Sequence, residues 1–444
     1  MEHAIDREKI LAMQADFLND PQLCARMNAV TKSGIDECAE SFLAPRKTPH
    51  TFSIELEAGK VTSQHRSGRC WLFAVLNVMR AKMIREMKLD PSFELSQSYL
   101  FFWDKLEKAN HFLENILRTL DLPGDDRLIH WLLTTPFEDG GQWDMLVSII
   151  QKYGVVPKTV MPETASSMNS GRMNKFLTLK AREYAALLRE GYRNGETREQ
   201  LSAKKERMLA EIFKILCISL GTPPDRFTFE IRNKDDKFYR DENLTPLEFY
   251  DRYVCMNLDD YVSLINAPTQ DKPFYATFTV EYLGNVEGGK DIRYLNLPID
   301  ELKEAALRQL EDGEPVWFGS DVGQMLSRKH GLMAMDAFDY ETLFCTEFPL
   351  DKAHRLDYCE SLMTHAMVIT GANVQNGKAD RWKVENSWGS DAGEEGWYRM
   401  SDAWFSEYVY QVVVNKKYLT DLQKQALQKT PIILRPWDPM GALA

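Results

Sequence analysis

Apolar residues in the first third of the chain recur at helical spacing. The stretch 70–88 is apolar on all sides in its first half, so we expect this helix to be buried. Asp90-Pro91-Ser92 ends it, and Glu138-Asp-Gly-Gly141 interrupts the last stretch of the series. The pattern predicts helices over 5–18, 70–88, 96–120 and 128–153.

Beyond residue 270 the pattern changes from helical to strand-like. Short runs there are rich in β-branched and aromatic residues, and a helix is predicted over 300–310. Helices come first and strands later, so the chain is predicted to be α+β rather than alternating βαβ. The predicted strands are 274–280, 316–322, 366–370 and 381–384.

The stretch 166–222 is helical in pattern, with a break at 191–195, but it differs from the rest in charge. Between Arg172 and Lys214 there are eleven Lys or Arg and six Asp or Glu residues. A nucleic-acid-binding patch is one interpretation, and a solvated insertion of mixed charge is the other. We favour the insertion because the opposite charges are interspersed.

Composition narrows the classes of protein. Hydrophobic residues make up 44% and charged residues 27% of the 444 positions, which is typical of globular proteins. The formal net charge of −12 argues against nucleic acid as the main partner. No run approaches 18 apolar residues, and the first twenty residues lack the pattern of a secretory signal, so no membrane association is expected.

The seven cysteines are odd in number and form no CxxC pair, so neither a disulfide framework nor a zinc ribbon is predicted. No HExxH motif is present either, and we expect no metal and no cofactor. Unpaired cysteines without an export signal indicate a reducing cytoplasm. We expect six of the seven to be buried as small apolar residues, with Cys70 as the exception.

Cys70 opens the helix predicted over 70–88. Helix N-termini stabilise anions, so the pKa of its thiol is expected to fall. Ser67 is a candidate cap, and Gly68 allows close approach of another backbone. The side-chain amide of Gln64, together with the Cys70 N–H, would stabilise the oxyanion of a tetrahedral intermediate. A structural cysteine at a buried helix start is the alternative.

A thiolate nucleophile needs an imidazole base, and the base needs an orienting acceptor. His365 heads a predicted strand, Asn376-Gly377 is a turn signal, and the next strand leads to Asn386. In such a hairpin His365 and Asn386 fall opposite one another, so the amide oxygen can accept the imidazole N–H. Trp388 could shield that bond from water. An incidental histidine in a packed hairpin is the alternative, and the coupled spacing disfavours it.

In this order, Gln-x5-Cys-Trp, a strand-borne His-Ala and Asn-Ser-Trp-Gly resemble the motifs of the papain-like cysteine peptidases. The resemblance implies a two-lobed fold, with a helical lobe and an antiparallel, β-barrel-like lobe. It implies that Cys70 is the nucleophile, His365 the general base and acid, Asn386 its orienter and Gln64 the oxyanion donor. Four further positions would then contact substrate in the cleft, namely Gly140, Gly141, Ala366 and Trp388.

Two departures from the family pattern are informative. Secreted members carry a disulfide between cysteines at the places held here by Ser67 and Glu138. The separation of Cys70 from His365 is also far longer than in small secreted members, and the basic helical stretch accounts for much of the excess. With Ser-Gly-Arg-Cys-Trp, the chain is similar to the aminopeptidase C / bleomycin hydrolase branch. That likeness implies a cytoplasmic homohexamer acting on peptides with a free N-terminus.

The Pro-rich C-terminal segment cannot form a regular helix, and residues alone would leave it a frayed tail. The resemblance implies instead that it lies in the cleft, where the carboxylate of Ala444 can meet the α-ammonium of the substrate. We therefore expect five parts: an N-terminal arm packing on the lobes (1–60), a helical lobe carrying the cysteine (61–165), an inserted helical subdomain (166–265), a β-rich lobe carrying the histidine and asparagine (266–430) and a C-terminal arm (431–444).

The expected activity is removal of N-terminal residues from peptides, with broad specificity, through a thiolate acyl-enzyme. One alternative keeps the same triad but makes the protein an amidase or acyltransferase. Another is a non-enzymatic oligomeric shell whose basic insertion binds nucleic acid. The complete Gln, Cys, His and Asn set weighs against the shell, since a scaffold needs none of them.

Overall fold

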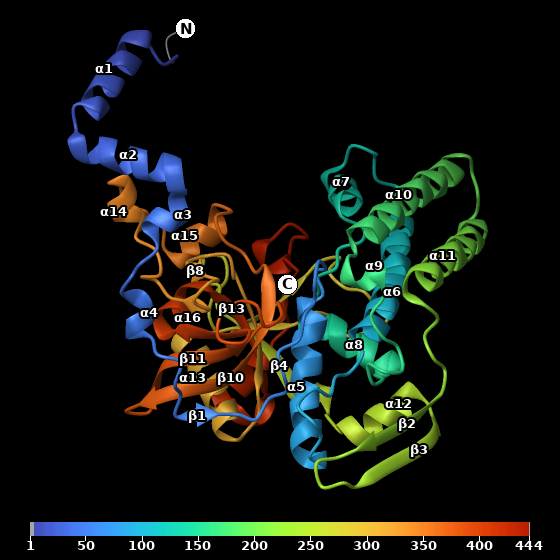
Figure 1. Cartoon of the computed structure of the whole chain (residues 1–444). Coiled ribbons are helices and arrows are strands. Elements are labelled where there is room, and N and C mark those ends of the chain that lie inside the picture. The colour runs from blue at the N-terminus through green and yellow to red at the C-terminus, as the bar shows by residue number, and fades with distance from the viewer. Residues whose placement is uncertain (1–3, 444) are drawn as a thin grey trace.

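The large sheet lies on one side of the molecule and the helices α5 to α11 on the other, as the computed structural model shows (Figure 1). The structure describes residues 4–443. The α+β prediction is confirmed, and the predicted helices form close to their expected bounds. The helical side is built from α5 (Cys70–Met87), α6 (Gln97–Arg118), α7 (Arg127–Thr134) and α8 (Trp143–Tyr153).

The helix α5 is the buried axis that carries the candidate nucleophile. Fourteen of its eighteen residues are buried, as expected for a helix that is apolar all round. It packs against β10 and β7 of the large sheet and against α6. The helix ends at Lys88, which adopts a left-handed conformation with φ of 55°.

The sheet side is one mixed sheet, which within residues 4–443 has twelve strands in the order β14-β5-β6-β4-β13-β7-β10-β11-β12-β9-β8, with β1 pairing on β10. Two helices, α13 (Ile299–Glu311) and α16 (Asp402–Tyr408), pack against it. The strands are β1 (Ile54–Glu55), β4 (Tyr261–Ile265), β5 (Ala276–Val280), β6 (Tyr294–Asn296), β7 (Val316–Ser320), β8 (Leu326–Ser327), β9 (Leu332–Met333), β10 (His365–Gln375), β11 (Lys378–Glu385), β12 (Trp397–Ser401), β13 (Val409–Asn415) and β14 (Ile432–Leu434).

The range 166–265 is not purely helical, contrary to expectation. It contains α9 (Ala165–Met168), α10 (Gly171–Arg193), α11 (Arg198–Leu220) and α12 (Pro246–Phe249), but also the hairpin of β2 (Phe227–Arg232) and β3 (Phe238–Leu244). The hairpin alternates apolar and polar residues and packs Phe229 against Phe249. The last residues of the range 166–265 form β4, which pairs with β13 and β6 in the large sheet.

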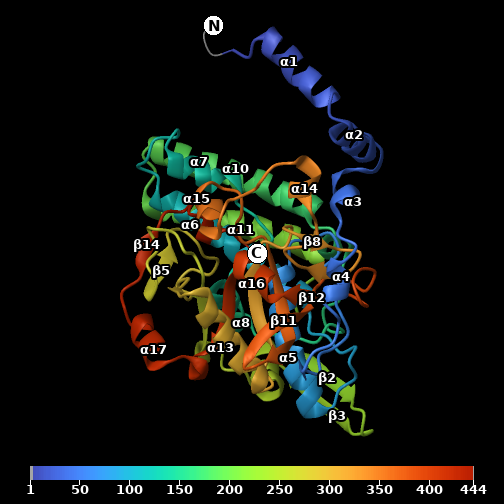
Figure 2. The same cartoon turned by 90° about the vertical axis from the view of Figure 1, so that its left-hand side faces the viewer.

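The two chain ends behave differently. Helices α1 (Arg7–Leu18) and α2 (Pro21–Ser33) project away from the body, and α3 (Ile35–Ala39) and α4 (Ala44–Lys47) lead back to it (Figure 2). At the other end, α17 (Asp421–Leu427) precedes β14, which pairs in parallel with β5. The tail is therefore seated on the sheet rather than frayed.

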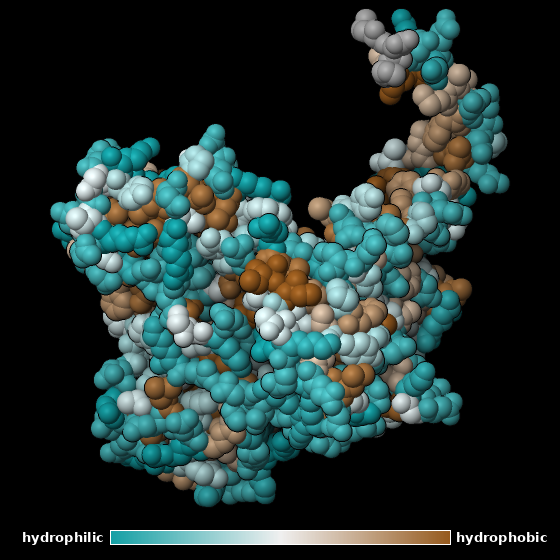
Figure 3. Space-filling view, turned by 180° about the vertical axis from the view of Figure 1, so that it is seen from behind, coloured by the Kyte–Doolittle hydropathy of each residue, from teal (hydrophilic) through white to brown (hydrophobic). Residues whose placement is uncertain are grey.

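Two surface properties bear on function. Apolar patches interrupt a mostly polar face of the body, and the projecting arm carries apolar side chains of its own (Figure 3). Within residues 4–443, no helix has both the length and the hydropathy needed to cross a membrane.

Candidate active site

Cys70 is the first residue of α5, and its side chain is buried, with 2% exposure. Because α5 packs against β10, the sulfur lies beside the start of that strand, where the Ala366 N–H interacts with it. The N–H groups of Cys70 and Trp71 at the helix start act on the sulfur in the same way. The fold thus brings the predicted nucleophile next to the segment that carries the predicted base.

His365 and Asn386 are joined by a direct contact between their side chains. His365 Nε2 lies 2.8 Å from Asn386 Oδ1. The Ser387 N–H donates to the same Oδ1 at 2.7 Å, which fixes the orientation of the amide, since only its oxygen accepts. Nε2 therefore carries the imidazole proton, and Nδ1 keeps the lone pair that a base needs.

The hairpin prediction that joined these two residues is confirmed. β10 pairs with β11 in antiparallel register, with Val368 opposite Glu385. The turn between them holds Asn376 at φ 53° and Gly377 at φ 77°, the left-handed pair that two-residue hairpin loops favour. His365 begins β10 and Asn386 follows β11, so strand pairing sets their separation.

The pKa values of the two groups favour a neutral resting pair. Burial raises the pKa of the Cys70 thiol to about 11, more than the backbone N–H groups of Ala366 and Trp71 lower it. Burial lowers the pKa of His365 to about 4, against the opposing effect of its bond to Asn386. The expected fall in the thiol pKa is therefore wrong for the resting site, because desolvation in the closed cleft outweighs the helix N-terminus.

Gln64 is tied to the same strand end. Its N–H donates to the Ser387 carbonyl at 2.7 Å, and its Oε1 accepts the Ser387 hydroxyl at 2.6 Å. Its Nε2 donates to the Ser67 carbonyl at 2.5 Å. An amide NH₂ has two protons, so the group has a second N–H to offer to an oxyanion beside Cys70.

Trp388 covers the histidine. The two rings lie with centroids 4.9 Å apart, and the Arg328 guanidinium lies 4.5 Å from the Trp388 ring. His365 is only 4% exposed. This arrangement excludes water from the imidazole–amide bond, as the sequence led us to expect for Trp388.

The Gly140–Gly141 loop packs directly on the nucleophile helix. A Cβ at Gly141 would lie 2.7 Å from the Trp71 ring, so no larger residue fits without a shift. The Gly140 carbonyl accepts the Lys108 ammonium at 2.6 Å. On the other side, Ala366 pairs with Gly319 of β7. The four positions predicted to contact substrate thus come from three separate segments.

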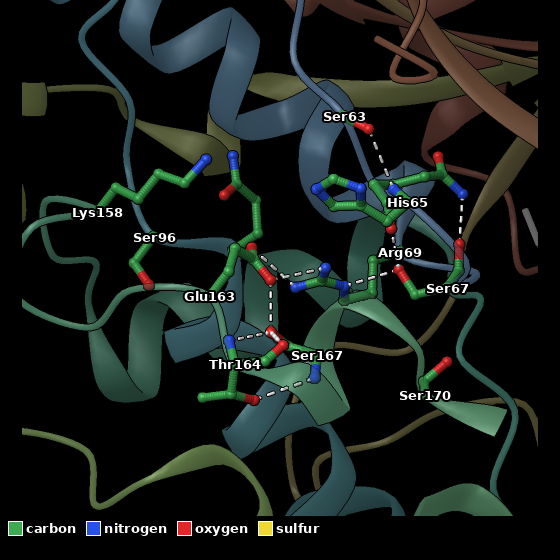
Figure 4. A network of polar contacts seen from close by, with 12 residues as sticks. Ser63, His65, Ser67, Arg69, Ser96, Lys158, Glu163, Thr164, Ser167 and Ser170 are labelled. Atoms are coloured by element: carbon green, nitrogen blue, oxygen red, sulfur yellow. Dashed lines mark hydrogen bonds and ion pairs between the residues drawn. The ribbon is translucent and has the colours of Figure 1, made fainter. Parts of the chain in front are cut away.

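A buried charge network beside Cys70 escaped the sequence analysis. Arg69, with no exposed side-chain surface, forms a bidentate pair with Glu163 at 2.9 and 3.1 Å and donates to the Ser67 hydroxyl at 2.9 Å (Figure 4). Ser67 in turn donates to the Gln64 carbonyl at 2.7 Å. A signal was present in the sequence, because an arginine immediately precedes a helix whose first half is apolar.

The C-terminal arm contacts both the segment before β5 and the helical side of the molecule. Asp438 pairs with the buried Lys272 at 3.0 Å, and Trp437 stacks under Arg127 at 3.8 Å. Gln142, the residue after Gly141, donates its amide N–H to the Ala442 carbonyl at 2.5 Å. Ala444 itself, the predicted contact for the substrate ammonium, lies outside the described residues.

The cysteines differ from expectation. All seven are free thiols, but Cys70 alone among them is buried. Cys255, Cys345 and Cys359 are exposed and have φ between 49° and 61°, so they occupy surface turns that follow short helical segments. The prediction that the other six cysteines are buried is therefore wrong. Among residues 4–443, no group of three or more His, Cys, Asp or Glu is placed to hold a metal ion.

Several known proteins are similar to this chain over nearly its whole length. The crystal structure of PepW from Lactobacillus rhamnosis superposes with a TM-score of 0.98, at 49% identity and with both chains fully covered. Aminopeptidase C of Listeria monocytogenes is 48% identical over 444 residues, covering both chains fully. Human bleomycin hydrolase is 42% identical over 99% of each chain. A profile of the Peptidase C1-like family matches residues 4–441. The chain belongs to the Peptidase C1-like family.

Proposed function

We propose that this protein is a cysteine aminopeptidase that removes N-terminal residues from peptides. The observation that carries the proposal is the pair of His365 and Asn386, 2.8 Å apart, beside Cys70 at the start of a buried helix. Relatives about 48% identical over the full chain, which are named aminopeptidase C, support it.

The proposed reaction uses the neutral resting pair. As the peptide carbonyl enters, His365 Nδ1 takes the Cys70 proton and the sulfur attacks the carbonyl carbon. The oxyanion accepts hydrogen bonds from the Cys70 N–H and the second Gln64 N–H. The imidazolium, held by Asn386, then protonates the leaving amine as the C–N bond breaks. Water, deprotonated by His365, hydrolyses the thioester and frees Cys70.

Recognition of a free N-terminus is proposed to come from the C-terminal arm. Its anchoring by Lys272, Arg127 and Gln142 directs the end of the chain past the Gly140–Gly141 loop. The carboxylate of Ala444 would meet the substrate α-ammonium, and the arm would block longer peptides from extending beyond it. This would make an open peptidase cleft act only on N-terminal residues.

We also propose a homohexamer in the cytoplasm. All twelve residues of α1 are exposed, including apolar Ile10, Leu11 and Phe17, and such surface is normally covered by a partner. The seven free thiols suit a reducing compartment. The excess positive charge of α10 and α11 is partly neutralised by pairs such as Lys205–Glu114 and Lys204–Glu196, which does not favour a nucleic-acid site.

Labelling with a thiol-directed epoxide, followed by peptide mapping, tests the assignment. We expect modification at Cys70, with loss of arylamide hydrolysis in proportion to labelling. Reaction at an exposed thiol such as Cys345, with Cys70 unmodified, would contradict it. Release of amino-acid arylamides, compared with transfer to added amines, separates a peptidase from an amidase or acyltransferase using the same residues.

A further inference from the structure

A buried carboxylate joins the loop before the nucleophile to the loop that faces substrate. Asp139 immediately precedes Gly140, and its Oδ2 accepts the Gly68 N–H at 3.1 Å, two residues before Cys70. The Asp139 carbonyl accepts the Trp71 indole N–H at 2.8 Å. One residue thus contacts the chain on both sides of the nucleophile.

Two lysines of α6 bind Asp139 and the backbone on either side of it. Lys105, whose side chain has no exposed surface, lies 2.7 Å from Asp139 Oδ1 and also donates to the Glu138 carbonyl at 2.9 Å. Lys108 donates to the carbonyls of Glu138 and Gly140, at 2.9 and 2.6 Å. The backbone on either side of Asp139 is therefore fixed to a helix, although the segment itself has no regular structure.

The inserted region reaches the same carboxylate. The Ser170 hydroxyl donates to Asp139 Oδ2, and the Asn174 amide donates to Oδ1 at 2.6 Å. With Gly68 and Lys105, four donors from α6, from the start of α10 and from the nucleophile loop converge on one side chain. Lys105 and these donors hold the pKa of Asp139 below its usual range although burial opposes them, so the group is a carboxylate at neutral pH.

The loop that contains Gly68 and the Gly140–Gly141 loop are packed so closely that a shift of one must displace the other. A Cβ at Gly68 would lie 2.9 Å from the Asp139 Cβ, and one at Gly141 would lie 2.7 Å from the Trp71 ring. The two loops therefore touch on both sides of Cys70 with no space for independent movement.

We infer that Asp139, held by Lys105, is a positioning residue that sets the placement of the Gly140–Gly141 loop relative to the Cys70 sulfur. The inference deepens the proposed peptidase function and rests on it. Its physical basis is that a misplacement of about 1 Å between nucleophile and bound carbonyl costs about 100-fold in rate. A buried ion pair with four donors restricts this placement more than one hydrogen bond would.

The test separates positioning from stability with three variants: Asp139→Asn, Lys105→Met and the double variant. Removing one partner leaves the other charge buried and unpaired, so each single variant is expected to be destabilised, whereas the double variant regains stability. If Asp139 positions the loops, kcat/KM per mole of folded protein falls about 100-fold in Asp139→Asn and stays low in the double variant. Recovery of kcat/KM together with stability would overturn the inference.

A matched control and a milder variant complete the series. Glu107, also buried on α6, pairs with Lys152 at 2.5 Å and with the Tyr153 hydroxyl rather than with the loops above. Glu107→Gln should therefore lose stability while kcat/KM per mole of folded protein stays within about twofold. Ser170→Ala removes one donor to Asp139 and should fold, with kcat/KM reduced about threefold to tenfold.

A readout independent of hydrolysis separates failure of this inference from failure of the proposed function. Alkylation of Cys70 by iodoacetamide, followed by peptide mapping to separate it from the exposed thiols, depends on the thiol alone, whereas a peptidyl epoxide must also align with the Gly140–Gly141 loop. We expect the ratio of the epoxide rate to the iodoacetamide rate to fall at least tenfold, about 1.4 kcal/mol, in Asp139→Asn. An unchanged ratio would overturn the inference even if the unmodified enzyme hydrolyses arylamides, and absence of hydrolysis by that enzyme would refute the function itself.

Discussion

The two sides of the cleft hold their reactive groups by different means. On the sheet side, His365 and Asn386 stand at the ends of paired strands, and the β10–β11 register sets their separation. On the helical side, Cys70 follows a loop that has only isolated β-bridges, at Ser63 and Arg66, and buried charges on Arg69 and Asp139 anchor that loop. The comparison teaches that buried ion pairs can hold a loop in place, much as backbone hydrogen bonds hold the end of a paired strand.

One ion pair joins the two sides. Arg80 lies on α5, ten residues after Cys70, and contacts Glu385, the residue before Asn386, at 2.6 Å. Both side chains are 1% exposed. Arg80 also donates to the Lys60 carbonyl at 2.5 Å, which ties in the segment leading to Gln64. The nucleophile helix and the strand bearing the orienting amide are thereby held in one relative position.

The largest expected effect removes the nucleophile or its base. Cys70→Ala and His365→Ala should each lower kcat by more than about 10⁴-fold, and the double variant should lose little more, because the two groups act as a unit. Initial rates on an amino-acid arylamide measure this. Cys345→Ser, at an exposed thiol, is the control and should keep full activity. Additive losses in the double variant would mean that the two sides act independently.

The second prediction compares anchoring on the two sides. Arg69→Met leaves Glu163 buried without its partner and should lower the free energy of unfolding by about 3–5 kcal/mol. Ser387→Ala, on the sheet side, removes one hydrogen bond to Gln64 and should cost about 1 kcal/mol. Urea unfolding followed by circular dichroism measures both. Equal losses would remove the contrast between charge-anchored loop and paired strand.

The third prediction concerns Gln64, which belongs to the helical-side loop but is bonded to the sheet side through Ser387. Gln64→Ala should lower kcat about 10²–10³-fold with little change in KM, because an oxyanion donor acts mainly in the transition state. Steady-state kinetics test this, with Gln151→Ala, on the exposed face of α8, as the control. A change confined to KM would assign Gln64 to substrate binding instead.

The fourth prediction follows from the low pKa of His365. The folded site keeps this imidazole neutral down to a pH of about 4, whereas the unfolded chain protonates it near its ordinary value of 6.5. Between these two pH values the unfolded chain binds more protons than the folded protein, and lowering the pH therefore favours the unfolded state. The free energy of unfolding should fall by roughly 1.4 kcal/mol for each unit by which the pH is lowered. Urea unfolding between pH 7 and 4 should show a shallower dependence for His365→Gln. Identical slopes in both proteins would contradict the shift.

The smallest expected effect concerns the arm that crosses between the two sides. Deleting the residues after Met440 should lower hydrolysis of free-amine substrates about tenfold, which corresponds to one charge-assisted hydrogen bond. The same deletion should admit peptides with a blocked N-terminus. Comparing a free and an acetylated arylamide measures the change in preference. An unchanged preference would show that the arm does not select the free amine.

Sequence reasoning succeeded where the signal is local. The helix over 70–88 follows from an unbroken apolar run, and the β10–β11 hairpin follows from two apolar strands around Asn376-Gly377. Because the period of a strand is two, the hairpin also brings the side chains of His365 and Asn386 to the same face. The β2–β3 hairpin was missed, since its alternation stands within a long, charged helical region.

The sequence by itself determined which residues are proposed to carry the chemistry: a cysteine at a helix start, a histidine and asparagine paired through a hairpin, and a glutamine six residues before the cysteine. Only the tertiary structure decided how these groups are held. Arg69 meets Glu163 across 94 residues, and Asp139 meets Lys105 and Gly68, because packing brings distant segments together. Burial likewise raises the pKa of Cys70, and the position of a cysteine at a helix start does not reveal how deeply it is buried. Periodicity depends on residues that are close in the sequence and can be recognised there. Desolvation and ion pairing depend instead on which distant residues the folded chain brings around each group.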